Sequence, residues 1–181
     1  MTDSARFFVI TGGPGSGKST LLAALAEDGL ATMPEGGRAI IKEQVAIGGQ
    51  ALPWADRALF AELMLAHDIR TYRAAQERAG VALFDRGVPD VVGYLRLSGL
   101  PVPAHVERAA CAFRYAPTVF VAPPWPEIFS SDAERRQSLA EAEATHRAMV
   151  DVYTGLGYDL VPLPLAAVEK RARFVRARIG A

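Results

Sequence analysis

The amino-acid sequence predicts an α/β fold in which layers of helices enclose a central parallel sheet. Short apolar runs alternate along the chain with longer segments of helical periodicity, which is the pattern of strands joined by helical crossovers. A glycine-rich stretch at 12–19 stands between the first apolar run and the first helical segment. The length of 181 residues fits one domain with a sizeable core, so we expect residues 1–181 to form a single domain.

The apolar runs and the helical segments define the expected elements. Strands are expected at Phe7–Thr11, Leu30–Met33, Val81–Phe84, Thr118–Ala122 and Tyr158–Val161. Helices are expected at about 17–28, 38–47, 54–79, 89–98, 103–114, 132–155 and 165–179. In the longest helix the apolar face should consist of Leu59, Leu63, Ala66, Ile69 and Ala74. The last helix should expose a basic face made of Lys170, Arg171, Arg173, Arg176 and Arg178.

The charge balance and the cysteine content narrow the class of protein. Lysine and arginine together number 20, as do aspartate and glutamate, so no net charge draws the chain to nucleic acid or to an anionic membrane. The basic last helix leaves a nucleic-acid or lipid surface as a local alternative. Without a signal peptide or the roughly 20 apolar residues of a membrane span, we expect a cytoplasmic protein. Cys111, the single cysteine, lies among alanines and indicates a small buried side chain rather than a catalytic thiol.

The glycine-rich stretch is the clearest functional motif. Gly12-Gly13-Pro14-Gly15-Ser16-Gly17-Lys18-Ser19 has the spacing G-x-x-x-x-G-K-S of a P-loop between a strand and a helix. Its backbone N–H groups would surround the phosphates of a nucleotide, Lys18 would reach the β- and γ-phosphates, and Ser19 would hold Mg²⁺. We therefore expect ATP and Mg²⁺ as cofactors. The expected nucleotide-binding residues are Gly13, Pro14, Gly15, Ser16, Gly17, Lys18, Ser19 and Thr20.

A second candidate group follows the third strand, because ligands of open parallel sheets sit at the carboxyl ends of strands. Asp85 is placed there to hold Mg²⁺, directly or through a water molecule, or alternatively only to cap the following turn. Motor ATPases of the AAA class usually follow this aspartate with a glutamate that activates water. Here Arg86 follows, and an arginine cannot accept a proton. Arg86 is therefore expected to bind the acceptor or to neutralise phosphate charge.

A third group follows the second strand. Glu35 could accept the proton of a substrate hydroxyl during attack on the γ-phosphate, and Arg38 could hold a substrate anion or Glu35 itself. The alternative is a solvated glutamate–arginine pair at the start of a helix.

Two further candidates complete the expected site. Arg135 and Arg136 would lie early in a helix capped by Ser131 and Glu134, and could form a lid that closes positive charge over the transferred phosphate. An exposed charged helix face is the alternative. Trp54 could stack on a planar substrate or could pack against the long helix that follows it.

The ordered series of motifs resembles a family of small bacterial P-loop proteins with an AAA domain, related to the nicotinamide riboside kinase domain of NAD regulators and to nucleoside and nucleotide kinases. The residues that carry the likeness are 12–21, Glu35 with Arg38, Leu52-Pro53-Trp54, Leu59-Phe60, Asp85-Arg86-Gly87 with Pro89-Asp90, Pro123-Pro124-Trp125 with Glu127-Ile128, Asp132 with Glu134-Arg135, and Gly157-Tyr158. The likeness implies a P-loop NTPase fold of the nucleoside- or nucleotide-kinase type. Its three-layer sandwich would hold a five-stranded parallel sheet in the order 2-3-1-4-5, with a lid at about 126–145. In the related nucleoside kinases a glutamate after the second strand is the usual base, which favours that role for Glu35.

Three functions fit these residues. The leading hypothesis is a kinase that moves the γ-phosphate of ATP to the hydroxyl of a small molecule, with Lys18, Glu35, Asp85, Arg86, Arg135 and Arg136 in catalysis and Glu35, Arg38, Trp54 and Arg86 at the substrate. The alternatives are an ATPase that acts with a partner and a nucleotide-dependent regulatory module. A conventional GTPase is disfavoured, because a chain without asparagine cannot carry the guanine-reading motif Asn-Lys-x-Asp.

Overall fold

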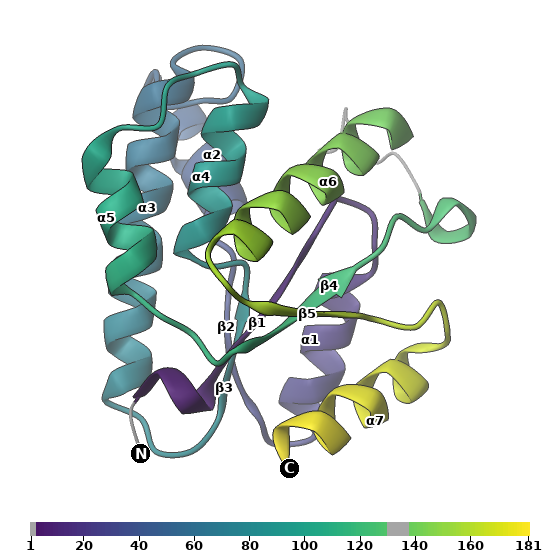
Figure 1. Ribbon diagram of the computed structural model, residues 1–181. Coiled ribbons are helices and arrows are strands. Elements are labelled where there is room, and N and C mark those ends of the chain that lie inside the picture. The colour runs from purple at the N-terminus through teal and green to yellow at the C-terminus, as the bar shows by residue number, and fades with distance from the viewer. Residues whose placement is uncertain (1–2, 130–137) are drawn as a thin grey trace.

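A parallel sheet forms the centre of the computed structural model, which describes residues 3–129 and 138–181 (Figure 1). Its described strands are β1 (Phe7–Gly12), β2 (Ala31–Met33), β3 (Ala82–Asp85), β4 (Thr118–Ala122) and β5 (Asp159–Pro162). Within the described residues they make a five-stranded sheet in the order β2-β3-β1-β4-β5, and each neighbouring pair is parallel. The predicted fold class and strand order are confirmed.

The strand register brings the expected site residues to one edge of the sheet. Ile10 of β1 lies opposite Asp85 of β3, and Gly12 of β1 lies opposite Ala122 of β4. The carboxyl ends of these three central strands therefore meet where the glycine-rich stretch leaves β1. This edge is where an open parallel sheet binds its ligands.

Helices cover both faces of the sheet and form the outer layers. On one face, α1 (Lys18–Glu27) and α7 (Val168–Ile179) pack together and against an apolar cluster that includes Ile10, Leu25, Phe120 and Val175. On the other face, α6 (Leu139–Gly155) crosses β1, β4 and β5. Figure 1 shows α1 with α7 and α6 on either side of the strands.

The remaining helices extend the second layer beyond the sheet. They are α2 (Gly37–Ile47), α3 (Arg57–Gln76), α4 (Val88–Leu97) and α5 (Ala104–Ala112), and short 3-10 helices occur at η1 (Asp3–Arg6) and η2 (Pro126–Ile128). A separate apolar cluster holds α3, α4 and α5 together through residues such as Leu65, Val91 and Val106. Figure 1 shows these helices beside one another at the β2 side of the sheet.

The apolar face predicted for α3 is wrong by about one residue. Leu59, Ala66 and Ala74 are exposed, and the buried face consists instead of Phe60, Ala61, Leu65, Tyr72 and Ala75. Apolar residues occur on nearly every side of this helix, so spacing alone allows more than one face. Packing against α4 on one side and the sheet on the other selects the observed one.

Two other expectations need correction or fall outside the described chain. Cys111 was expected to be buried but is exposed, because the buried side of α5 is formed by Val106, Ala109 and Ala110. The described part of α6 begins at Leu139 behind a capping box of Ser138 and Glu141. The start expected near Ser131 lies outside the described residues.

No helix in the described part of the chain combines the length and apolar character needed to cross a membrane.

Candidate active site

The glycine-rich stretch folds as a loop that joins β1 to α1, with its glycines at tight positions. Gly15 and Gly17 have φ values of 71° and 74°, in the left-handed region that L-residues with side chains rarely adopt. A Cβ at Gly13 would lie 2.3 Å from the backbone oxygen of Ala142 in α6. The loop therefore fits tightly against α6 and presents the start of α1, where helical N–H groups favour an anion.

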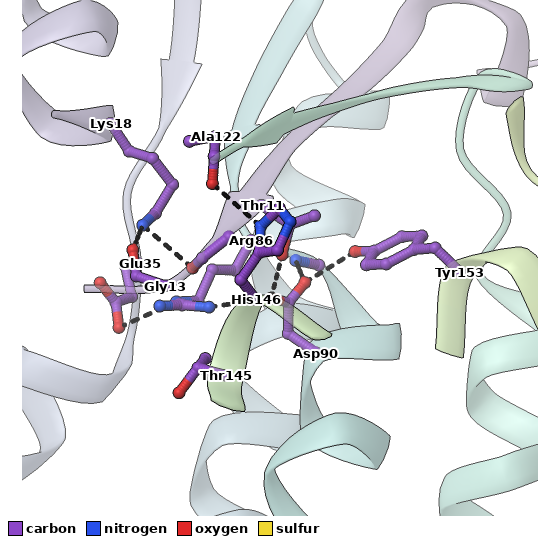
Figure 2. A network of polar contacts seen from close by, with 12 residues as sticks. Thr11, Gly13, Lys18, Glu35, Arg86, Asp90, Ala122, Thr145, His146 and Tyr153 are labelled. Atoms are coloured by element: carbon purple, nitrogen blue, oxygen red, sulfur yellow. Dashed lines mark hydrogen bonds and ion pairs between the residues drawn. The ribbon is translucent and has the colours of Figure 1, made fainter. Parts of the chain in front are cut away.

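Lys18 is folded back on this loop. Its side chain is 7% exposed, and its Nζ donates hydrogen bonds to the oxygens of Gly12 (3.1 Å) and Gly13 (2.6 Å) and to Ser16 Oγ (3.2 Å). Burial, and then the positive charge of Arg86, lower the pKa of Lys18 to about 7. Figure 2 shows the ammonium directed at the loop backbone and towards Glu35. The loop carbonyl oxygens thus bind the Lys18 ammonium, which the charged phosphates of a nucleotide would bind more strongly.

Arg171 of α7 supports the same loop, although the sequence placed it on an exposed basic face. It is 2% exposed, and its Nη1 donates to the backbone oxygens of Ser16 (3.1 Å) and Gly17 (3.4 Å). Its guanidinium lies 5.5 Å from the centre of the Trp125 ring, and burial lowers its pKa. The Nε and Nη2 atoms are buried and have no hydrogen-bond partner within the described chain. Sequence reasoning missed this residue because a basic run near a C-terminus is typical of a solvated face.

Asp85 has the environment expected of a metal ligand. Its Oδ1 is buried without a hydrogen-bond partner among the described residues. Burial, and then the charge of Glu35, raise the pKa of Asp85. Asp85, Ser19 and Glu35 line a small cavity of about 280 Å³ next to the loop. A divalent cation would both satisfy the orphaned oxygen and stabilise the carboxylate, so these residues fit Mg²⁺.

Glu35 and Arg86 meet at the end of the sheet. Arg86 Nε lies 3.4 Å from Glu35 Oε1, and both side chains are largely buried. Burial by itself would raise the pKa of Glu35, but the charges of Arg86, Lys18 and Arg38 outweigh it and bring the pKa below its usual value. Glu35 is therefore ionised and able to accept a proton at neutral pH. Arg38 is exposed in the first turn of α2, and Arg86 is the stronger partner of Glu35.

Arg86 is held in place by a buried carboxylate that the sequence interpretation did not assign to the site. Arg86 has a φ of 69°, the only positive φ of a non-glycine residue in the described part of the chain, and its Nη1 donates to Asp90 Oδ1 (3.0 Å). Asp90 also accepts hydrogen bonds from Thr11 Oγ1 (2.6 Å), Tyr153 Oη (2.7 Å) and the Gly87 N–H (3.0 Å). Figure 2 shows this network between β1, α4 and α6. The spacing of four residues between Arg86 and Asp90 could have predicted this ion pair from the sequence.

A cavity of about 1280 Å³ extends from the loop past Glu35 and Arg86 to the far ends of α2, α3 and α4. Its outer half is lined by apolar and aromatic side chains, among them Trp54, Phe60, Met64 and Tyr94. Trp54 lines the cavity and is 66% exposed, so it packs little against the rest of the chain, and its contact with a substrate stays a prediction. Arg38 also lines the rim. Arg135 and Arg136 lie outside the described residues.

Asp68 of α3 is a third residue that sequence reasoning missed. It lines the same cavity and is partly buried, and burial together with Asp90 and Glu35 raises its pKa well above the usual value. It lies three residues after Leu65 and four before Tyr72, so it shares the buried face of α3. Because the sequence analysis assigned the apolar face of α3 to other residues, it did not place Asp68 on the buried side of the helix.

The fold and the loop define a P-loop nucleotide-binding protein. A family model described as an AAA domain matches residues 7–171, and the chain belongs to this AAA-domain family. A search of curated proteins found no significant match.

Solved structures with the same fold include a deoxyadenosine kinase, a thymidylate kinase and the NadR protein. Deoxyadenosine kinase from M. mycoides superposes with a TM-score of 0.68 at 13% identity, over 96% of this chain and 98% of that chain. Thymidylate kinase from Ehrlichia chaffeensis gives 0.63 at 12% identity, over 98% of this chain and 100% of that chain. The NadR protein in complex with NR gives 0.69 at 18% identity, over 98% of this chain and 52% of that chain. At these identities the likeness establishes the fold.

Proposed function

We propose that the protein is a kinase that uses Mg²⁺ and ATP to phosphorylate a hydroxyl group of a small, nucleoside- or riboside-like molecule. The observation that carries the proposal is the position of Glu35. This ionised carboxylate stands between the phosphate-binding loop and an apolar cavity that continues past it. Kinase folds among the structural neighbours support the same reaction class.

Each residue then has a role that follows from its surroundings. Lys18 leaves the loop carbonyls to neutralise the β- and γ-phosphates, and Ser19 and Asp85 hold Mg²⁺. When bound, Mg²⁺ supplies charge neutralisation for the phosphates. Glu35 accepts the proton of the acceptor hydroxyl, and Arg86, fixed by Asp90, orients Glu35 and adds positive charge near the transferred group. Trp54, Phe60 and Tyr94 enclose the body of the acceptor.

Transfer to a hydroxyl is favoured over hydrolysis because Arg86 stands where water-activating ATPases usually carry a glutamate. An arginine cannot accept a proton from water. The described residues also provide far more space beyond Glu35 than an attacking water molecule needs.

The test replaces Glu35 by glutamine, which keeps the size of the side chain and removes the proton acceptor. Phosphate transfer from labelled ATP should be measured with a panel of nucleosides, ribosides and hydroxylated antibiotics, against a blank without acceptor. Glu35→Gln should lower transfer by about 10²- to 10⁴-fold and leave ATP affinity nearly unchanged. The matched control is Glu43→Gln, which should retain activity because Glu43 is exposed on α2, the helix that follows Glu35.

Two results would contradict these assignments, the first the role of Glu35 and the second the kinase activity. Full transfer by the Glu35→Gln variant would remove its role as the base. Steady hydrolysis without any acceptor, at rates on the order of 1 s⁻¹ or more, would identify an ATPase instead.

A further inference from the structure

The segment that carries Glu35 lies between a short edge strand and a helix with a small buried face. It follows β2, a strand of three residues at one end of the sheet, and leads into α2, whose buried residues are Gly37 and Ile40. Gly36, the N-cap of α2, makes no side-chain cap hydrogen bond. A weakly packed segment is free to move, whereas a proton acceptor must stay within hydrogen-bond reach of its substrate. Glu35 therefore needs support from another element.

His67 of α3 supplies that support. Its Nε2 lies 3.4 Å from the backbone oxygen of Pro34. A carbonyl oxygen can only accept a hydrogen bond, so the imidazole donates through a protonated Nε2. The imidazole also covers Gly36, because a Cβ at that glycine would lie 2.4 Å from Cδ2 and 2.5 Å from Cγ of His67. One side chain thus contacts the residues on both sides of Glu35.

These contacts, rather than the backbone conformation, account for the two glycines after Glu35. Gly36 has a φ of −82° and a ψ of −29°, a right-handed conformation that most residues adopt readily. A side chain at this position would instead displace the imidazole of His67. At Gly37 a Cβ would lie 3.2 Å from Oε1 of Glu35, so the carboxylate folds back over this glycine. His67 and the two glycines therefore define the path of Glu35 towards Arg86.

We propose that His67 is a positioning residue that fixes segment 34–36 and thereby keeps the carboxylate of Glu35 beside Arg86. Without the imidazole, the segment should relax away from α3, and Glu35 should lose its contact with the guanidinium. A histidine that merely fills space against Gly36 would affect stability and leave Glu35 in place. The effect on the position of Glu35 is independent of any reaction, whereas the effect on catalysis rests on the proposed function.

The first test measures the pKa of Glu35 in the protein without ligands, by NMR titration of labelled glutamate side chains, with Glu35→Gln to identify the signal. Burial raises this pKa, but the surrounding positive charges, first that of Arg86, outweigh burial and lower it. His67→Ala releases the carboxylate from both effects, so the pKa of Glu35 should rise towards its ordinary value. His67→Gln, whose amide can donate to the Pro34 oxygen, should restore part of the lowering.

The second test measures transfer from labelled ATP to the same panel of nucleosides, ribosides and hydroxylated antibiotics. His67→Ala should lower kcat by about tenfold to 10²-fold, because a small displacement of a catalytic group causes a loss of that size, and should leave the KM for ATP within about twofold. The matched control is His105→Ala, which removes an exposed imidazole on α5 and should change neither kcat nor the pKa of Glu35.

A further pair of variants tests the contact between His67 and Gly36. Gly36→Ala places a Cβ where the imidazole lies, so it should also raise the pKa of Glu35. In the double variant with His67→Ala the added methyl group meets no ring, so the effects of the two changes should not add. If His67→Ala does not fold, Gly36→Ala decides, and an unchanged pKa of Glu35 overturns the proposal.

Three other results would overturn it: an unchanged pKa of Glu35 in folded His67→Ala, an equal rise in His105→Ala, or a KM for ATP that rises as much as kcat falls. Failure of the proposed function has a different signature. A wild-type protein that transfers no phosphate, with a pKa of Glu35 that still depends on His67, would reject the kinase and keep the positioning role. Phosphate transfer with a pKa of Glu35 that is independent of His67 would do the reverse.

Discussion

Lys18 is a buried ammonium group, and we propose that it binds the phosphates of a nucleotide. Burial and Arg86 lower its pKa to about 7, and among the described residues its Nζ donates hydrogen bonds to the carbonyl oxygens of Gly12 and Gly13 and to the hydroxyl oxygen of Ser16. Those oxygens compensate incompletely for the loss of water. Phosphate oxygens carry full charges and would favour the ammonium form more strongly.

This gives a prediction about pH. Because bound phosphates raise the pKa of Lys18, nucleotide binding above pH about 7 should take up one proton, and affinity should fall by up to about tenfold per pH unit above that value. Calorimetry at pH 8 in two buffers with different ionisation enthalpies measures the proton uptake. Lys18→Arg, which stays charged, is the control and should show none. Wild-type affinity that is constant from pH 7 to pH 9 would contradict the prediction.

At the scale of elements, α6 links the glycine-rich loop to the hydrogen-bond network of Asp90 behind Arg86. Its first turns press the oxygen of Ala142 against Gly13, and its last turns place Tyr153 Oη 2.7 Å from Asp90 Oδ2. The start of α6 is fixed by reciprocal hydrogen bonds between Ser138 and Glu141. The position of this helix therefore matters to both ends of the site.

Removal of the cap should weaken the fold. Ser138→Ala removes the oxygen that accepts the Glu141 N–H, so the free energy of unfolding should fall by about 1 kcal/mol, within a range of roughly 0.5–2 kcal/mol. Urea denaturation measures the change. Thr154→Ala on the exposed side of the same helix is the control and should be neutral or slightly stabilising. Equal losses in both variants would show that the cap contributes nothing specific.

The positions of the helices and strands were largely predictable from the sequence, but which side of some helices is buried was not. Strands such as β1 and β4 are runs of apolar residues that form a buried strand wherever they pair, so their positions follow from local chemistry. Asp68 and Arg171 were missed for a different reason. A charged residue on a helix is usually solvated, and only the packing of α3 and α7 against other elements shows that these two face inward.

At the scale of the whole molecule, the topology collects the site from distant parts of the chain. The central strands β1 and β3 deliver the loop and Asp85-Arg86, and Glu35 follows the edge strand β2. The strand order came from the resemblance to kinases rather than from the apolar pattern, because the pattern shows which segments are strands but not which are neighbours. Once β3 was assigned, the spacing of four residues could predict the ion pair between Arg86 and Asp90. The hydrogen bond from Tyr153 to Asp90 could not be predicted, because it depends on the packing of α6 against α4.

The same connectivity joins the C-terminal helix to the proposed nucleotide site. Because Arg171 of α7 donates to the backbone of Ser16 and Gly17, ligand binding at the loop should stabilise the whole fold through α1 and α7. Mg²⁺ and ATP at about 100 times the dissociation constant should add about 2.7 kcal/mol and raise Tm by roughly 5–11 °C for a chain of this size.

Arg171→Met should reduce that effect, since the methionine fills space but cannot hold the loop carbonyls. Loss of these charged hydrogen bonds should weaken nucleotide affinity by about tenfold, so at the same nucleotide concentration the rise in Tm should be smaller by roughly 3–5 °C. Arg173→Met is the matched control, because Arg173 is exposed one position past Ala172 and should keep the full rise. Thermal melts with and without nucleotide measure both variants. An undiminished rise in Arg171→Met would mean that the loop keeps its binding conformation without α7, and that the buried guanidinium serves the packing of the helix alone.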